Sequence, residues 1–153
     1  MPDGDVLTRA ELLARVDRAW RDLRERVRHL GRARLAERTA TGWTYKDLVG
    51  HMAAWEEEAA RGLRALRDGG EVPTFGSGAA VDAFNERAVR ERRLVGPEAI
   101  LDELEAAHRQ LVRVIEALPE ALLADARAQR WIAGNTYNHY AEHDDELGAF
   151  TAR

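Results

Sequence analysis

Apolar residues recur at every third or fourth position over long stretches of this chain, a spacing that places them on one face of an α-helix. The first stretch begins at Thr8 and Glu11, which form a capping-box pattern, and is expected to stop at Gly31. Its apolar face comprises Leu12, Leu13, Val16, Trp20, Leu23, Val27 and Leu30. A long helix with one apolar face must pack against partners, so we expect several such helices to form the protein.

Three further stretches show the same spacing, over residues 44–68, 97–118 and 131–150. The earliest of them begins with another cap pattern, Thr44 and Asp47, and the next begins with Pro97, which suits the first turn of a helix. No segment shows the strict alternation of apolar and polar residues that is typical of a strand. Four long helices in 153 residues predict an all-α protein, a four-helix bundle formed by a single domain over residues 1–153.

The longest irregular segment, residues 69–78, is rich in glycine and lies between the second and third long helices. A shorter helical pattern follows it, through Val81, Phe84 and Val89. Irregular segments of this length in a compact domain are often functional. We therefore expect this segment to form a crossover connection or the lid of a pocket.

The charge and the cysteine content limit the classes of function that this protein can have. The formal net charge is -4 and both signs are interspersed, so we expect no nucleic-acid partner, because nucleic-acid binders concentrate positive charge on one face. The absence of cysteine excludes disulfides and thiolate metal ligands. No apolar run approaches the ~20 residues that span a bilayer, and residues 1–5 lack the pattern of a signal peptide. We expect a cytoplasmic protein with no membrane partner.

Two histidines interrupt the apolar face of the last stretch. His139 and His143 are four residues apart, so on a helix both imidazoles project from one side and can bind one metal ion. His51 lies three residues after Leu48 and four before Trp55, on or beside the buried face of the second stretch. It is the candidate for a third ligand. The inward positions of the last stretch are Ile132, Thr136, His139, His143, Leu147 and Phe150.

Two interpretations of these histidines are open. They can be core residues hydrogen-bonded to neighbours, although each buried ring nitrogen without a partner costs about 1–3 kcal/mol. Alternatively, His51, His139 and His143 hold one divalent ion such as zinc or nickel and leave a coordination position for water or substrate. A metal held in this way can lower the pKa of bound water toward ~7 or activate a substrate thiolate.

Two other metal patterns are present in the sequence. Residues 139–143 match H-x-x-E-H, an inverted zinc-protease motif, but Glu142 is adjacent to His143 and a small bundle offers no protease cleft. Glu105 and His108 have the E-x-x-H spacing of di-iron bundles, and the sequence contains no second copy of it. We expect His108 to be structural.

Other side chains are expected to surround the three histidines. We expect Trp55, Asn135 and Tyr140 to line a pocket beside them, with Trp43 and Trp131 acting mainly as core anchors. The charged outer face of the second helix is expected to comprise Glu56, Glu57 and Arg61.

The sequence resembles a known family at these same residues. Residues 42–55, Gly-Trp-Thr-Tyr-Lys-Asp-Leu-Val-Gly-His-Met-Ala-Ala-Trp, resemble the second-helix signature of the DinB/YfiT-like superfamily, and His139 and His143 are similar to its final-helix pair. Within that superfamily, residues 131–143 look most like the ClbS/DfsB-type branch. The resemblance spans nearly the whole chain in helix order.

The resemblance implies a DinB-like four-helix bundle, often dimeric, with a crossover connection between helices 2 and 3. It also implies that His51, His139 and His143 bind a divalent metal such as nickel or zinc. Members include transferases that use a low-molecular-weight thiol and a branch that hydrolyses or sequesters a reactive genotoxin. Two functions follow. One is a metal-dependent hydrolase or thiol transferase acting on a small electrophilic molecule, and the alternative is a ClbS/DfsB-like binding or genotoxin-protection protein that works without metal.

Overall fold

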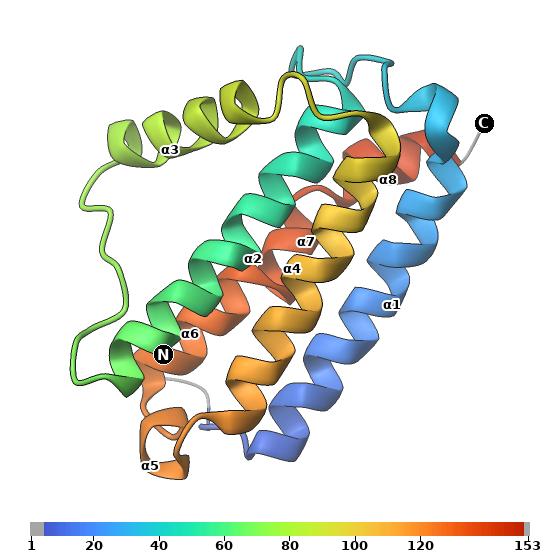
Figure 1. Ribbon diagram of the computed structural model, residues 1–153. Coiled ribbons are helices and arrows are strands. Elements are labelled where there is room, and N and C mark those ends of the chain that lie inside the picture. Colours follow the sequence, from blue (N-terminus) through green and yellow to red (C-terminus); the bar gives the residue numbers. More distant parts are fainter. Residues whose placement is uncertain (1–4, 152–153) are drawn as a thin grey trace.

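A computed structural model describes residues 5–151, with side chains as far as Leu147. Four long helical segments lie side by side in it (Figure 1). They are α1 (Arg9–Arg34), α2 (Tyr45–Arg67), α4 (Pro97–Ala117) and a fourth segment composed of α6 (Ala126–Asn135), α7 (Tyr137–Glu142) and α8 (Asp144–Thr151). Two shorter helices, α3 (Gly78–Glu91) and α5 (Glu120–Leu123), lie in the connections. The predicted all-α bundle is confirmed, and within the described residues the only extended pairing is an isolated bridge between Arg38 and Thr44.

The helices begin where the cap patterns predict. Thr8 and Glu11 form a complete capping box at α1, and Thr44 and Asp47 form another at α2. Gly31, where the first helix was expected to stop, instead forms a kink with φ 68° and ψ 161°, and a last helical turn continues to Arg34. A residue with a side chain avoids that conformation, so glycine is required at this kink.

The crossover connection expected between the second and third bundle helices is also confirmed. In Figure 1, α2 and α4 run downward while α1 and the last segment run upward, so α2 and α4 are parallel neighbours. The chain must therefore return along the length of the bundle between them. It does so through residues 68–96, which include α3 on the outer side of α2.

The last segment is broken, whereas a continuous helix was expected over residues 131–150. Thr136 leaves the helical conformation, with φ -126° and ψ -109°, and its hydroxyl donates to the carbonyl of Ile132 at 2.7 Å. His143 separates α7 from α8. A side-chain bond from Thr136 to the backbone replaces part of the helical pattern, which explains the break. The expected burial of Phe150 concerns a side chain outside the described residues.

The core contains two apolar clusters with a polar layer between them. One cluster contains Leu30 and Leu48, and the other contains Leu12 and Ile115. Glu56 lies in the layer with its side chain fully buried, so its assignment to the charged outer face was wrong. The spacing already indicated this position, because Glu56 is four residues after Met52 and three before Ala59, both of which are buried.

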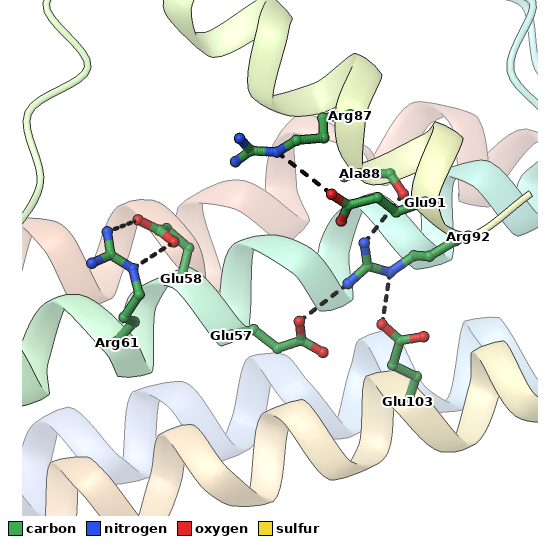
Figure 2. A network of polar contacts seen from close by, with 8 residues as sticks. All are labelled: Glu57, Glu58, Arg61, Arg87, Ala88, Glu91, Arg92 and Glu103. Carbon is green, nitrogen blue, oxygen red and sulfur yellow. Dashed lines mark hydrogen bonds and ion pairs between the residues drawn. The ribbon is translucent and has the colours of Figure 1, made fainter.

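An arginine connects the crossover to the bundle (Figure 2). Arg92, at the end of α3, donates to Glu103 of α4 at 2.6 Å and to Glu57 of α2 at 3.1 Å, and it also donates to the carbonyl of Ala88. Its side chain is only 13% exposed. The three helices are therefore connected through one guanidinium group, a geometry that suits its fixed fork of donors.

Across residues 5–151, no helix has both the length and the apolar character needed to cross a bilayer.

Candidate metal centre and adjoining cavity

The structure brings together three histidines from distant parts of the chain. His51 projects from α2, His139 from α7 and His143 from the junction of α7 and α8. The Nε2 atom of His139 lies 2.9 Å from Nε2 of His51 and 3.3 Å from Nε2 of His143. One ligand atom from each residue lies within 4.8 Å of the other two. The histidine pair is therefore convergent, because α7 spans the residues between its members and His143 is the C-cap of that helix.

The orientation of His143 is fixed by a carboxylate. Its Nδ1 lies 2.8 Å from an Oε1 atom of Glu146 in α8. Because a carboxylate accepts hydrogen bonds, Nδ1 carries the proton and donates it, which leaves the Nε2 lone pair facing the other two histidines. A histidine with such a partner is held in one ring orientation as a metal ligand.

Burial keeps the other two imidazoles neutral. The pKa of His51 is lowered from 6.5 to about 3, chiefly because burial penalises the charged ring, and further by the charges of His139 and His143. The pKa of His139 is lowered to about 3 by burial and then by His143. Neutral imidazole is the form that binds a metal ion, so both rings are in the required state at physiological pH.

The protonation pattern of the cluster favours a cation. Nε2 of His139 faces two other Nε2 atoms, and a single proton on it can be donated to only one of them. Nitrogen ligands about 2.0–2.1 Å from a tetrahedral zinc lie about 3.3 Å apart. His139 and His143 have this separation, 3.3 Å, whereas His51 and His139 are closer, at 2.9 Å, and all three ligand atoms lie within 4.8 Å of one another. The three residues therefore fit one divalent ion, which would satisfy all three lone pairs.

A cavity of about 430 Å³ opens beside the histidines. The indoles of Trp43, Trp55 and Trp131 form much of its wall, and Nε1 of Trp55 donates to Oδ1 of Asn85 at 2.8 Å. The volume is in the range of pockets that hold small organic molecules. Its complete lining comprises Trp43, His51, Trp55, Val81, Asn85, Arg130, Trp131, Gly134, Asn135, His139, Glu142 and His143.

Two of the three residues expected around the pocket lie in this lining, namely Trp55 and Asn135. Tyr140 does not, because α7 turns its side chain into the core, where its hydroxyl donates to Glu56 at 2.8 Å. Burial raises the pKa of Tyr140 well above its ordinary value, so it stays protonated. His108, expected to be structural, is buried in the same layer.

Sequence interpretation missed several lining residues. Trp131 is four residues before Asn135, so helical spacing could have placed it on the same face. Val81 and Asn85 come from α3, and no sequence signal indicated that this helix covers the site. Segment 69–78, expected to form a crossover connection or a lid, contributes none of the lining residues. Its Phe75 packs against Trp55, with ring centroids 4.9 Å apart.

Comparison with known proteins identifies the family. A family model described as the DinB superfamily matches residues 6–146. The chain belongs to the DinB superfamily. The resemblance found in the sequence is thereby confirmed for this DinB superfamily member over almost its whole length. No curated protein matches the chain.

Two solved structures share the fold of this DinB superfamily member. One is an uncharacterised protein from Escherichia coli UTI89, with a TM-score of 0.81 and 18% identity over 95% of this chain and 93% of the other. The second is the colibactin self-resistance protein ClbS in complex with a double-stranded DNA. It also has a TM-score of 0.81 and 18% identity, over 94% of this chain and 95% of ClbS. At this identity the likeness concerns the fold.

The ClbS complex corrects one sequence-based prediction. Nucleic acid was excluded as a partner on the basis of the acidic net charge, yet a protein with this fold has been solved with double-stranded DNA. Net charge is a sum over the whole chain and does not describe any one face. The exclusion of nucleic acid was therefore wrong.

Proposed function

We propose that this DinB superfamily member is a metal-dependent enzyme that acts on small electrophilic molecules bound in the tryptophan-lined cavity. The observation that supports this proposal most strongly is the convergence of the Nε2 atoms of His51, His139 and His143 at the wall of that cavity. A three-histidine set leaves a coordination position for water or substrate, as catalytic sites do.

Each part of the site has a role in this proposal. A bound zinc or nickel ion supplies a Lewis acid that lowers the pKa of water or of a low-molecular-weight thiol. The three histidines hold the ion, and Glu146 fixes the ring of His143. The indole faces of Trp43 and Trp55 bind the apolar part of the substrate and exclude water from it. Hydrolysis and thiol transfer share these requirements and differ only in the nucleophile.

Metal analysis of protein purified without a histidine tag tests this function. We expect about one divalent ion per chain, and its loss in His139→Ala. His29→Ala is the matched control, because His29 is exposed on α1. Equal, sub-stoichiometric metal in all three proteins would exclude the metal centre. Turnover of a model electrophile with and without added thiol then distinguishes a transferase from a hydrolase.

The alternative is a small-molecule binding or genotoxin-protection protein that uses the same cavity without metal. The cavity itself supports it, because Trp43, Trp55 and Asn135 form a wall that does not depend on an ion. In that case the neutral imidazoles of His51 and His139 serve as hydrogen-bonding or acid–base groups. Ligand-induced stabilisation that survives a chelator would favour this function, and stabilisation that requires metal would exclude it.

We also propose that α1 can contact DNA. This helix contains nine arginines and only four acidic residues, although the chain as a whole is acidic. The side chains of Arg21 and Arg28 are 78% and 64% exposed, and their ion pairs with acidic neighbours are of the weak surface kind. Exposed arginines of this sort bind phosphates without reading sequence.

Fluorescence anisotropy with a duplex oligonucleotide at two salt concentrations tests the contact. Affinity should fall steeply between about 50 and 200 mM salt, and the Arg21→Glu, Arg28→Glu double variant should lose it. Arg61→Glu on α2 is the control, since Arg61 is exposed but lies on a different helix. Absence of binding at the lower salt concentration would exclude α1 as a DNA-binding surface.

A further inference from the structure

A fully buried carboxylate lies at the centre of the bundle, outside the cavity. Oε1 of Glu56 accepts a hydrogen bond from the hydroxyl of Tyr140 at 2.8 Å and lies 2.7 Å from Nδ1 of His108. The indole of Trp20 is stacked on His108, with ring centroids 3.9 Å apart and planes 8° apart. Side chains from α4 and α7 therefore meet at one oxygen atom of α2, and α1 packs behind them through Trp20.

Burying this group is costly, so its presence calls for an explanation. Oε2 of Glu56 is buried and has no hydrogen-bond partner, although buried polar atoms are nearly always paired. An apolar side chain of similar size would fill this position without that cost. The layer between the two apolar clusters is thus less stable than it could be, and the carboxylate has a role other than packing.

Tyr140, whose hydroxyl donates to Glu56, indicates what that role is. It lies in α7, a helix of six residues that ends at breaks on both sides, at Thr136 and His143. A helix this short is not stable alone and depends on contacts with the rest of the protein. Its two buried side chains are His139, which faces His51, and Tyr140, which reaches the carboxylate from the adjacent position.

We propose that Glu56 and Tyr140 are positioning residues that hold α7 so that His139 faces His51 and His143. The bond from Tyr140 attaches the short helix to α2, and His108 and Trp20 fix the carboxylate from α4 and α1. The position of His139 is therefore set by the bundle interior, whereas the ring of His143 is oriented by Glu146. The effect that we expect on metal binding rests on the proposed function.

Three substitutions distinguish a role in holding α7 in position from a role in packing the core. Tyr140→Phe removes only the hydroxyl, and Glu56→Leu removes the acceptor while keeping the side-chain volume. Glu56→Gln keeps an acceptor oxygen for Tyr140 and places its amide nitrogen where the unpaired Oε2 lies. This variant should therefore retain the position of α7. Ile115→Val is the control for general destabilisation, because Ile115 is fully buried in the apolar cluster that does not contain Tyr140.

Hydrogen exchange of the α7 amides is the first measurement. We expect exchange over residues 137–143 to increase about tenfold in Tyr140→Phe and Glu56→Leu, the factor that corresponds to one buried hydrogen bond. Glu56→Gln should stay within about threefold of the wild type. Ile115→Val should not change this segment selectively. Equal α7 exchange in all variants would overturn the proposal.

Zinc affinity of the same full-length proteins is the second measurement. It should fall about tenfold in Tyr140→Phe and Glu56→Leu and be retained in Glu56→Gln. Unchanged affinity in the first two variants, with a wild type that binds zinc, would also overturn the proposal. If the wild type binds no zinc, the proposed enzyme function fails, and the exchange data still decide whether these residues position α7.

Discussion

Two imidazoles of the cluster are neutral well below the pH at which a free histidine takes up a proton. His51 and His139 both have a pKa of about 3, against 6.5 for the unperturbed group. Between these values the unfolded chain binds more protons than the folded chain, so the free energy of unfolding falls as the pH falls. The contribution of each histidine is complete above about pH 6.5 and decreases below it by up to ~1.4 kcal/mol per pH unit.

We predict that metal-free protein loses stability between pH 7.5 and 5.5, and that His139→Gln loses about 1 kcal/mol less than the wild type over this interval. Urea unfolding in the presence of a chelator measures the difference. The comparison is necessary because burial raises the pKa of Glu56, which acts in the opposite direction and is common to both proteins. The same pH dependence in both would show that His139 is not buried as a neutral ring.

The bond between Glu146 and His143 gives a second prediction at the level of residues. Glu146→Leu should weaken metal affinity by about 10–100-fold, because His143 then loses the acceptor that orients its ring. Isothermal titration with zinc measures this. Glu142→Leu removes an equal charge from the cavity lining without touching Nδ1 of His143. Comparable losses in the two variants would attribute the effect to net charge and not to orientation.

Among the helices, α2 and α6 approach closely at a glycine. A Cβ atom on Gly62 would lie 2.6 Å from Cδ of Pro73 and 2.8 Å from Nε1 of Trp131, both too close. We predict that Gly62→Ala destabilises the protein by about 1–3 kcal/mol, since Trp131 must move from the cavity wall. In contrast, Gly134→Ala in α6 meets no atom within 4 Å and should stabilise by about 0.5–1 kcal/mol. Chemical denaturation measures both changes, and a neutral Gly62→Ala would contradict the close packing.

The attachment of α3 depends on Arg92. Arg92→Ala should cost about 1–3 kcal/mol, because Glu57 and Glu103 lose a largely buried partner, and burial already raises the pKa of Glu57. Arg61→Ala removes an exposed pair with Glu58 and should change stability by less than about 0.5 kcal/mol. Figure 2 shows both groups. Limited proteolysis of residues 68–96 should be faster only in Arg92→Ala. Equal cleavage rates in the two variants would show that Arg92 does not attach α3 to the bundle.

For the whole molecule, the sequence supported strong predictions about helices and weak ones about surfaces. The bundle followed from apolar spacing and caps, because these are local features that one helix carries by itself. The crossover was one of two expectations for segment 69–78 and was otherwise implied by the family resemblance. The prediction about nucleic acid failed because it used the total charge. A sum over the chain does not show local composition, such as the nine arginines and four acidic residues of α1.

Spacing within each helix determined which residues point inward, and this was enough to name His51, His139 and His143 as partners. Their approach to 2.9 and 3.3 Å was decided only by the tertiary structure, since it depends on how α2 and α7 pack. The same holds for the cavity wall supplied by α3 and for the buried bond between Tyr140 and Glu56. A periodic pattern gives the direction of a side chain from its own helix axis, whereas the atoms that it meets are set by the neighbouring helices.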